Sequence, residues 1–249
     1  MGGGPPLKPA EAGCSTGSPE ALARPYLKAM LIAAGELGYR GVGVADVIER
    51  TEPTAVEFDR YFTDTEECFV AAYEAGGDYL CATLLDAGAA ERGWAAGLRG
   101  ALVRLLELVT GQPAIAKALL IEVHAAGGRT MTKRKEVIER LSRALDGARR
   151  ETESRHSSSP LTGTFIVGAI EFAMSGYLQE AEPRPEQLWR QLPELMHLAV
   201  LPYLGEDAAW EAFDSAQAML DAGPWKERPA DDRLRAADDP GIGKDTNSH

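Results

Sequence analysis

Residues 33–70 read AAGELGYRGVGVADVIERTEPTAVEFDRYFTDTEECFV, and this stretch decides the fold. It predicts two short helices, at 44–50 and 54–62, separated by Thr51-Glu52-Pro53, because a proline disfavours a helical residue before it. A longer helix is expected at 25–37 and ends before Gly38. Asp64, with Glu67 three residues later, predicts the start of a fourth helix through a capping box. Short helices joined by a tight turn indicate a helix-turn-helix, whose last helix enters a DNA groove.

The rest of the chain carries the apolar period of helices and no strand pattern, so we expect an all-α protein. The head, with three helices, is expected at 20–65, and a larger helical body at 66–222. Further helices are predicted at 91–110, 113–126, 130–152, 161–180, 186–203 and 206–221. Pro193 is expected to kink the helix at 186–203. Residues 1–19 and 223–249 have little to bury, and are predicted to be a disordered arm and tail.

Composition excludes several classes of protein. The 249 residues carry a net charge of −12, so nucleic-acid binding, if present, must come from a local patch. The three cysteines, Cys14, Cys68 and Cys81, have no metal-ligand spacing and favour a reducing cytoplasm over a disulfide framework. We identify no signal peptide and no apolar run of transmembrane length. No motif of a nucleophilic, phosphate-binding or metal-dependent enzyme is present, so we expect neither enzymatic activity nor a cofactor or metal.

The spaced residues of the head resemble those of the tetracycline-repressor (TetR) family of transcriptional regulators. The matching positions in the first half are Glu36, Gly38, Tyr39, Val44, Asp46 and Val47. Those in the second half are Thr54, Phe58, Arg60, Tyr61, Phe62, Glu66 and Glu67. Val44, Val47, Phe58 and Phe62 are expected to form the small core of the head. The resemblance implies a cytoplasmic, homodimeric regulator, acting as a repressor, that binds operator DNA and responds to a small molecule.

By this resemblance, eight residues of the head are candidates for contact with DNA: Arg40, Thr54, Ala55, Glu57, Asp59, Arg60, Tyr61 and Thr65. Several departures from the family pattern weaken such contact. Val42 and Gly43 replace hydroxyl-bearing residues, and Glu57 and Asp59 place carboxylates on the helix that reads DNA. Residues 20–70 contain five basic and ten acidic side chains, a net charge of −5. Since phosphate contacts dominate affinity, the alternative is an acidic head with little DNA affinity, in a protein that binds a small molecule or a partner protein. A scaffold that pairs with another regulator is the third class of function.

The body offers candidates for a ligand pocket and a dimer interface. Glu122, His124 and Glu171 are polar residues in apolar surroundings, and Phe172 and Tyr177 lie close to the last of them in sequence. We expect these five to bind the ligand, although each is also compatible with an ordinary structural role. The segment 165–177 is apolar nearly all round, and the family resemblance implies that it pairs with 186–203 in a dimer. Its alternative role is a core helix of a monomer.

Two further features of the body have structural interpretations. Residues 129–155 hold nine basic and five acidic side chains, and their spacing indicates a solvated helix face with ion pairs rather than a nucleic-acid site. Cys68 and Cys81 are expected on the fourth helix. Cys68 occupies a position that is usually apolar in the family, so we interpret it as a core residue rather than a redox sensor.

Overall fold

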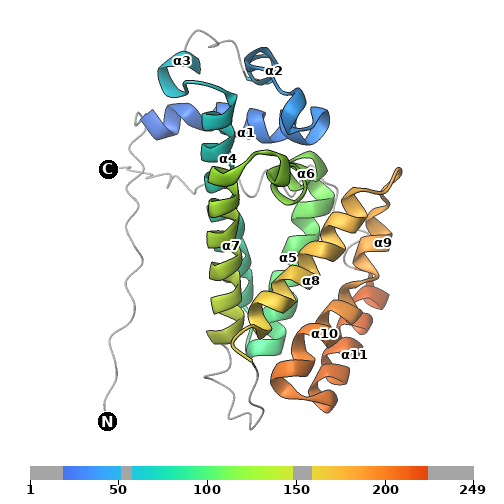
Figure 1. The fold of residues 1–249 in the computed structure, drawn as a ribbon. Helices are drawn as coiled ribbons and strands as arrows, with labels where there is room; N and C mark the ends of the chain where they lie inside the picture. Colours follow the sequence, from blue (N-terminus) through green and yellow to red (C-terminus); the bar gives the residue numbers. More distant parts are fainter. Residues whose placement is uncertain (1–18, 52–57, 148–158, 224–249) are drawn as a thin grey trace, which may run out of the picture.

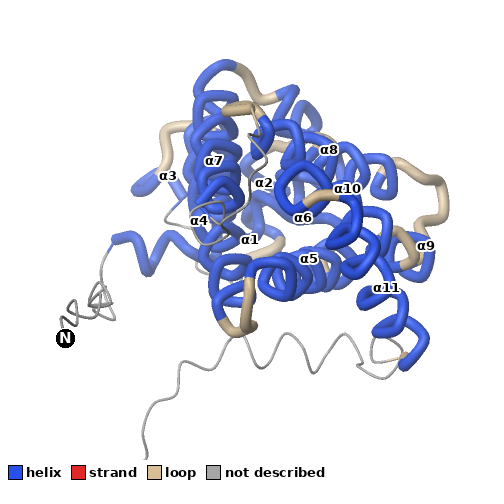
Figure 2. The backbone as a smooth tube through the Cα atoms, turned by 90° about the horizontal axis from the view of Figure 1, so that it is seen from below, coloured by secondary structure: helices blue, strands red, loops and turns tan. Residues whose placement is uncertain are grey.

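The computed structural model describes residues 19–51, 58–147 and 159–223, and these form helices joined by short turns. Figure 2 shows no strand in the described part of the chain, as the all-α prediction requires. The helices α1 to α6 are Pro19–Leu37, Val44–Glu49, Phe58–Tyr61, Thr65–Ala89, Trp94–Gly111 and Pro113–Leu120. The helices α7 to α11 are Gly128–Gly147, Thr162–Leu178, Pro185–Trp189, Leu192–Leu204 and Glu206–Ala222. The described residues also include two 3-10 helices, η1 (Tyr39–Gly41) and η3 (Glu122–Ala125).

The helices α1, α2 and α3 lie at one end of the molecule, and the later helices form the body below them (Figure 1). α1, α2 and α3 make the head, and α4 runs from the head down into the body beside α7. The predicted arm 1–19 and tail 223–249 fall, apart from one residue each, outside the described residues.

Three predicted helices differ from those observed. α1 begins at Pro19, so Pro25 lies inside the helix rather than at its start. The helix predicted at 186–203 is broken rather than kinked, because Pro193 occupies the first turn of a new helix, α10. The helix predicted at 113–126 ends at Leu120 and continues as the 3-10 helix η3.

The expected start of the fourth helix is confirmed, with one difference in its hydrogen bonds. The Asp64 side chain accepts a hydrogen bond from the backbone N–H of Glu67 at 2.8 Å. The Glu67 carboxylate accepts in return from the N–H of Thr63 at 2.8 Å, one residue before the cap. These bonds satisfy backbone donors that a helix start leaves without intrahelical partners.

The head packs around a cluster of aromatic and aliphatic side chains. Val47, Phe58 and Phe62 are buried as predicted, while Val44 is only partly buried. The Tyr39 ring contacts Phe69 of α4, with centroids 4.8 Å apart. The same cluster includes Ala118 and Ala126, so the expected boundary at 65/66 passes through packed side chains. Leu37, the last residue of α1, is half exposed.

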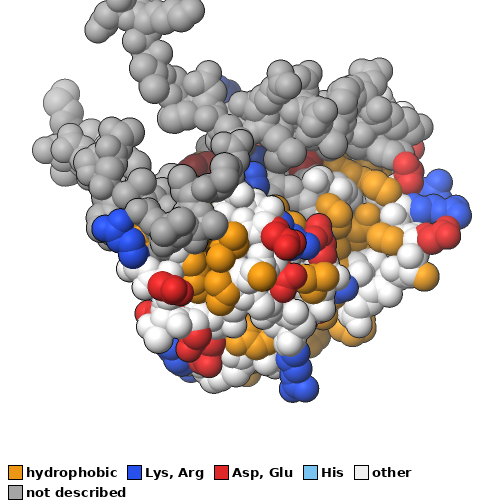
Figure 3. Space-filling model, turned by 90° about the horizontal axis from the view of Figure 1, so that it is seen from above, with side chains coloured by type: hydrophobic (Ala, Val, Ile, Leu, Met, Phe, Trp, Pro, Cys, Tyr) orange, Lys and Arg blue, Asp and Glu red, His pale blue; other side chains and the backbone are white. Residues whose placement is uncertain are grey.

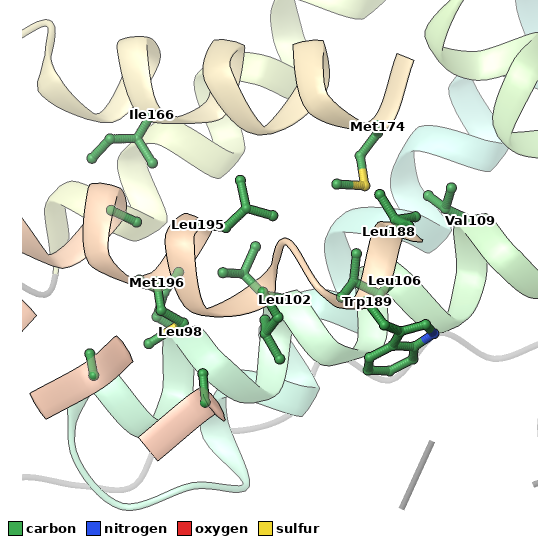
Figure 4. Close-up of a cluster of buried hydrophobic side chains, with 14 of the residues drawn as sticks. Leu98, Leu102, Leu106, Val109, Ile166, Met174, Leu188, Trp189, Leu195 and Met196 are labelled. Atoms are coloured by element: carbon green, nitrogen blue, oxygen red, sulfur yellow. The ribbon is translucent and has the colours of Figure 1, made fainter. Parts of the chain in front are cut away.

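A second cluster lies in the lower body, where α5, α8, α9, α10 and α11 meet. Figure 4 shows its leucines and methionines converging from α5, α8 and α10, with Trp189 at one edge. Leu98, Leu102 and Leu106 recur at helical spacing along α5 and turn one face to this cluster. The opposite side of the body, between α4, α5, α7 and α8, is less completely filled.

Head and body are joined by a direct backbone contact between α1 and α6. A Cβ atom added to Gly35 would lie 1.9 Å from the carbonyl oxygen of Ala114, so only glycine allows this approach. Gly38 then turns the chain with φ 77°, which also suits glycine. Next to it, the backbone N–H of Tyr39 donates to the Glu122 carboxylate at 2.8 Å. The orientation of the head is therefore fixed by α6 and η3.

The Gly35–Ala114 contact predicts a strong effect of one methyl group. Gly35→Ala should lower the free energy of unfolding by about 3 kcal/mol, because backbone must move away from backbone. Urea unfolding followed by circular dichroism measures this change. Gly111→Ala is the control: a Cβ there meets nothing within 4 Å, and its stability should change by less than about 1 kcal/mol. Equal midpoints for the two variants would contradict the proposed contact.

Candidate ligand cavity and DNA-binding head

A cavity of about 660 Å³ lies inside the body, enclosed by α4, α5, α6, α7 and α8. Its wall is mainly aliphatic, with leucines from α4, α5, α6 and α7, and Ile170 and Met174 from α8. A cavity of this size and lining, with few polar groups, is the usual form of a small-molecule site.

Three polar residues of the cavity wall, Tyr73, Arg134 and Glu171, lie near the head, where α4, α7 and α8 meet. Arg134 donates to Glu171 through Nε at 3.1 Å and through one terminal nitrogen to both carboxylate oxygens, at 2.6 and 2.5 Å. Tyr73, only 4% exposed, lies beside this pair. Burial raises the pKa of the Tyr73 hydroxyl, the Arg134 charge lowers it and the Glu171 charge raises it. The hydroxyl therefore remains protonated, and three side chains form one neutral polar group.

The other end of the cavity lies at the turn between α4 and α5. Leu85, Ala89, Glu91 and Gly93 all line the cavity there and are exposed. Leu85 is 47% exposed although it belongs to the cavity wall, which marks this end as the opening. The cavity thus has a polar inner end and a mouth at the α4–α5 turn.

Close helix contacts frame the cavity without filling it. A Cβ on Gly97 would lie 2.8 Å from the carbonyl oxygen of Gly88, so α4 and α5 touch through their backbones near the mouth. A Cβ on Gly77 would lie 2.6 Å from a methyl carbon of Val137, so α4 and α7 also approach closely. The helices carry larger side chains between these contacts and enclose space there.

The structure places only one of the five predicted ligand residues in the cavity wall. Glu171 lines the cavity. Phe172 follows it on the helix, points to the outer face of α8 and is 81% exposed. Tyr177 is buried, but in the lower-body cluster rather than against the cavity. Neighbours in sequence therefore separate, because successive residues of a helix point in different directions.

Glu122 and His124 lie on η3, outside the cavity lining. Glu122 accepts the hydrogen bond from Tyr39 and so contacts the head rather than a ligand. His124 is exposed. The sequence interpretation missed Tyr73 and Arg134. Arg134 could have been found, because it shares the apolar face formed by Val137, Ile138, Leu141 and Leu145, at steps of three and four residues.

The described residues of the head expose both signs of charge. Arg40 on η1 and Asp59 and Arg60 on α3 are exposed, while Tyr61 and Thr65 are partly buried. Thr54, Ala55 and Glu57 lie outside the described residues. Arg50 forms an ion pair inside the head. Its Nε and a terminal nitrogen donate hydrogen bonds to the Glu36 carboxylate at 3.2 and 2.8 Å. Viewed from the head end, the coloured side chains show acidic and basic groups interspersed rather than a broad basic surface (Figure 3).

The basic segment of α7 forms ion pairs, as predicted. Lys133 bonds Glu136 on the same helix at 3.3 Å and Lys135 lies 3.7 Å from Glu139. Additional partners come from α4, where Glu74 binds Lys133 at 2.7 Å and Asp78 binds Arg140. Asp146 accepts a hydrogen bond from Tyr203 at 2.8 Å. The pairs of Lys133 with Glu74 and of Arg140 with Asp78 join α7 to α4.

Cys68 and Cys81 are both buried on α4. Burial raises the pKa of the Cys68 thiol to about 12, and it also raises that of Cys81. Protonated thiols are poor nucleophiles, which agrees with a core role. Across the described ranges, no cluster of His, Cys, Asp or Glu is placed to hold a metal ion. None of the helices described has the length and apolar character needed to cross a membrane.

No protein-family model matches the sequence, and no curated protein matches it. Solved structures do match the fold. The transcriptional regulator FadR from Bacillus subtilis, in complex with stearoyl-CoA, has a TM-score of 0.63 and 14% identity, covering 72% of this chain and 98% of its own. The fatty acid degradation regulator FadR from Bacillus halodurans has a TM-score of 0.63 and 10% identity, covering 74% and 96%. A TetR family transcription regulator from Marinobacter aquaeolei VT8 has a TM-score of 0.51 and 18% identity, covering 76% and 94%. The chain therefore has the fold of TetR-family regulators, as its head sequence predicted.

The ion pair in the cavity predicts strong coupling between its partners. Arg134→Met or Glu171→Met alone should each lower the free energy of unfolding by about 2 kcal/mol, because a largely buried charge loses its partner. The double variant should be more stable than the sum of the two losses implies. Thermal unfolding of all four proteins measures this coupling. Additive losses would mean that the pair is too solvated to act as one neutral group.

Proposed function

We propose that the protein is a homodimeric, ligand-responsive DNA-binding regulator that represses transcription in the cytoplasm and has no enzymatic activity. In this proposal, residues 20–65 contact operator DNA, and residues 66–222 hold the ligand and the dimer interface. The observation that carries the proposal is the position of α6. Leu119 and Leu120 of α6 line the cavity, while Ala114 of the same helix contacts Gly35 of the head. One helix thus joins the site of a ligand to the proposed site of DNA binding.

The fold supports this function by analogy, and the chemistry supports it independently. The similar FadR structure from Bacillus subtilis is a complex with stearoyl-CoA, so a protein of this fold can bind a ligand of that size. In the present chain the cavity wall is apolar, with one group of polar residues at its inner end. A ligand changes DNA affinity only if it binds one dimer state more tightly than another. We propose that these states differ in the spacing of the two heads and therefore in their fit to two half-sites.

An exposed apolar face supports the homodimer. Five large side chains of α8, α10 and the residue before α8 are exposed together: Leu161, Phe165, Phe172, Leu198 and Leu201. Phe165 and Phe172 are 78% and 81% exposed, and both line shallow grooves between α8 and α10. Contiguous exposed apolar side chains of this size mark an interface. This exposure does not fit the alternative of a core helix in a monomer.

The acidic head favours the second candidate function, a TetR-like protein with low DNA affinity that binds a small molecule or a protein. Asp59 is exposed on α3, and Arg50 is already paired with Glu36. Each lost phosphate contact weakens binding and reduces its dependence on salt. Carboxylates can nevertheless accept hydrogen bonds from cytosine. The acidic side chains therefore lower the affinity for DNA but still permit recognition of a base. The two candidates therefore differ in the measured strength of DNA binding.

The dimer proposal predicts that one charge on the exposed face separates the subunits. Phe172→Arg should convert a dimer into a monomer, since two copies of the charge would face each other across a two-fold axis. Light scattering at micromolar concentration measures the mass. Tyr79→Arg on α4 is the control, because Tyr79 is another exposed aromatic side chain but does not belong to the α8–α10 face. A monomeric native protein, or a dimer that survives Phe172→Arg, would contradict the proposed interface.

The DNA proposal predicts salt-sensitive binding to the region upstream of the protein's own gene. Asp59→Lys should tighten this binding and steepen its salt dependence by about one unit of log K per log salt, because one phosphate contact is added. Asp59→Asn, which only removes the repulsion, should tighten binding without the steeper slope. Gel shifts over a range of low salt concentrations test both variants. Absence of salt-sensitive binding by the native protein would favour the second candidate function.

A further inference from the structure

The cavity is elongated. Its lining on α4 extends from Tyr73 to Ala89, a helix length of about 24 Å at the usual rise per residue. A volume of about 660 Å³ spread over that length describes an elongated space rather than a compact one. Such a space fits an extended chain better than a compact fused ring system.

The middle of the cavity offers no hydrogen bonds to a ligand. Between the two ends, α4 presents Gly77, Leu80 and Leu84, and the facing helices present only aliphatic side chains. A polar group buried against this wall would lose its hydrogen bonds to water without replacement. The central part of the ligand must therefore be apolar.

The inner end does not favour a charged group. Arg134 and Glu171 already satisfy each other through three hydrogen bonds, and their charges cancel. A ligand carboxylate that took Arg134 would leave Glu171 without a partner in a largely buried position, which is costly. The part of the ligand that reaches this end is therefore uncharged.

The mouth differs from the inner end in its access to water. Glu91 and Gly93 are exposed at the α4–α5 turn, and Leu85 borders both the cavity and solvent. A charged or bulky polar group can remain hydrated there while the attached chain is buried. The two ends of the cavity thus select opposite ends of an amphipathic molecule.

We propose that the cavity binds one unbranched aliphatic chain, acyl or alkyl, that enters through the α4–α5 turn. Its methyl end lies against Tyr73 and the Arg134–Glu171 pair, and its polar end stays at the mouth. This inference rests on the proposed function of the body as a ligand site. It adds the chemical class of the ligand and its direction in the cavity.

Chain length and head-group charge test the class of ligand. For fatty acids from octanoate to hexadecanoate below their micelle concentrations, the Kd should fall about fourfold per added methylene until the chain fills the cavity. The methyl esters should bind within about fivefold of the acids, because the polar end remains in water. Calorimetry on the full chain gives both series. Lack of binding by every chain, or a Kd independent of length, would overturn the proposal.

Direction in the cavity is tested by quenching the fluorescence of Trp94, which lines the cavity beside the mouth. Stearate carrying a nitroxide near its carboxylate should quench more strongly than stearate carrying it near its methyl end. Trp94→Phe should remove this difference. Trp210→Phe should preserve it, because Trp210 is exposed on α11 and does not line the cavity. Stronger quenching from the methyl end would reverse the proposed direction.

The ester series gives a second test of the direction. If a methyl ester binds more than about tenfold more weakly than its acid, the carboxylate forms a charged hydrogen bond inside the cavity, and the proposed direction is wrong.

A pair of variants separates binding in the cavity from binding elsewhere. Leu80→Trp narrows the middle of the cavity and should abolish the gain in affinity for the longer chains. Tyr79→Trp places the same side chain on the exposed side of the same helix and should leave the series unchanged. If both variants bind like the native protein, the chain binds outside this cavity and the proposal fails.

Failure of this inference can be distinguished from failure of the proposed function. Chain binding is measured without DNA, and DNA binding is measured by gel shift without added chain. Operator binding with no chain binding would reject the aliphatic ligand while leaving a regulator. Chain binding with no DNA binding would retain the ligand class and favour the second candidate function.

Discussion

The backbone contact between Gly35 and Ala114 is the constraint on which the arrangement of the molecule depends. Because no side chain separates α1 from α6 there, the head cannot tilt on the body without breaking packed surface on both sides. The hydrogen bond from Tyr39 to Glu122 adds a second attachment beyond the end of α1. The aromatic cluster of the head continues into α4 and α6, so head and body share one core at their junction.

The cavity arises from the same use of small residues. Helices α4 and α5 touch through Gly88 and Gly97, and α4 meets α7 through Gly77 and Val137. Helices held together at such points diverge where larger side chains intervene, and here the space between them is left unfilled. The Lys133–Glu74 and Arg140–Asp78 ion pairs lie along the α4–α7 seam and join the two helices on the outside. Exposed pairs of this kind contribute little stability individually.

The head was more predictable from sequence than the cavity, and the reason is the range of the interactions. Gly38, Asp64 and Glu67 act on backbone within a few residues, so local patterns identified the turn and the helix start. Pro193 is a local signal that is compatible with two structures, because a proline can kink a helix or lie in the first turn of a new one. In this protein it lies in the first turn of α10. The cavity residues Tyr73, Arg134 and Glu171 come from three helices, and no local pattern specifies that they meet. The one local indication was that Arg134 lies on the same apolar helix face as Val137 and Leu141. Glu122 was predicted to bind a ligand because it is a polar residue in an apolar segment. In the structure it accepts a hydrogen bond from the backbone of the head.

Helix α6 imposes a requirement on any regulation by a ligand. Leu119 and Leu120 form part of the cavity wall, and Ala114 at the start of the same helix contacts the head. A molecule that merely filled the existing space would bind without changing the head, since it would not distinguish two positions of α6. Regulation therefore requires that the filled and empty cavities favour different positions of this helix. The steric limit at Gly35 means that α1 moves with α6 rather than sliding over it. In the proposed dimer, a displacement at the cavity would reach the head as a rigid movement and would change the distance between the two heads.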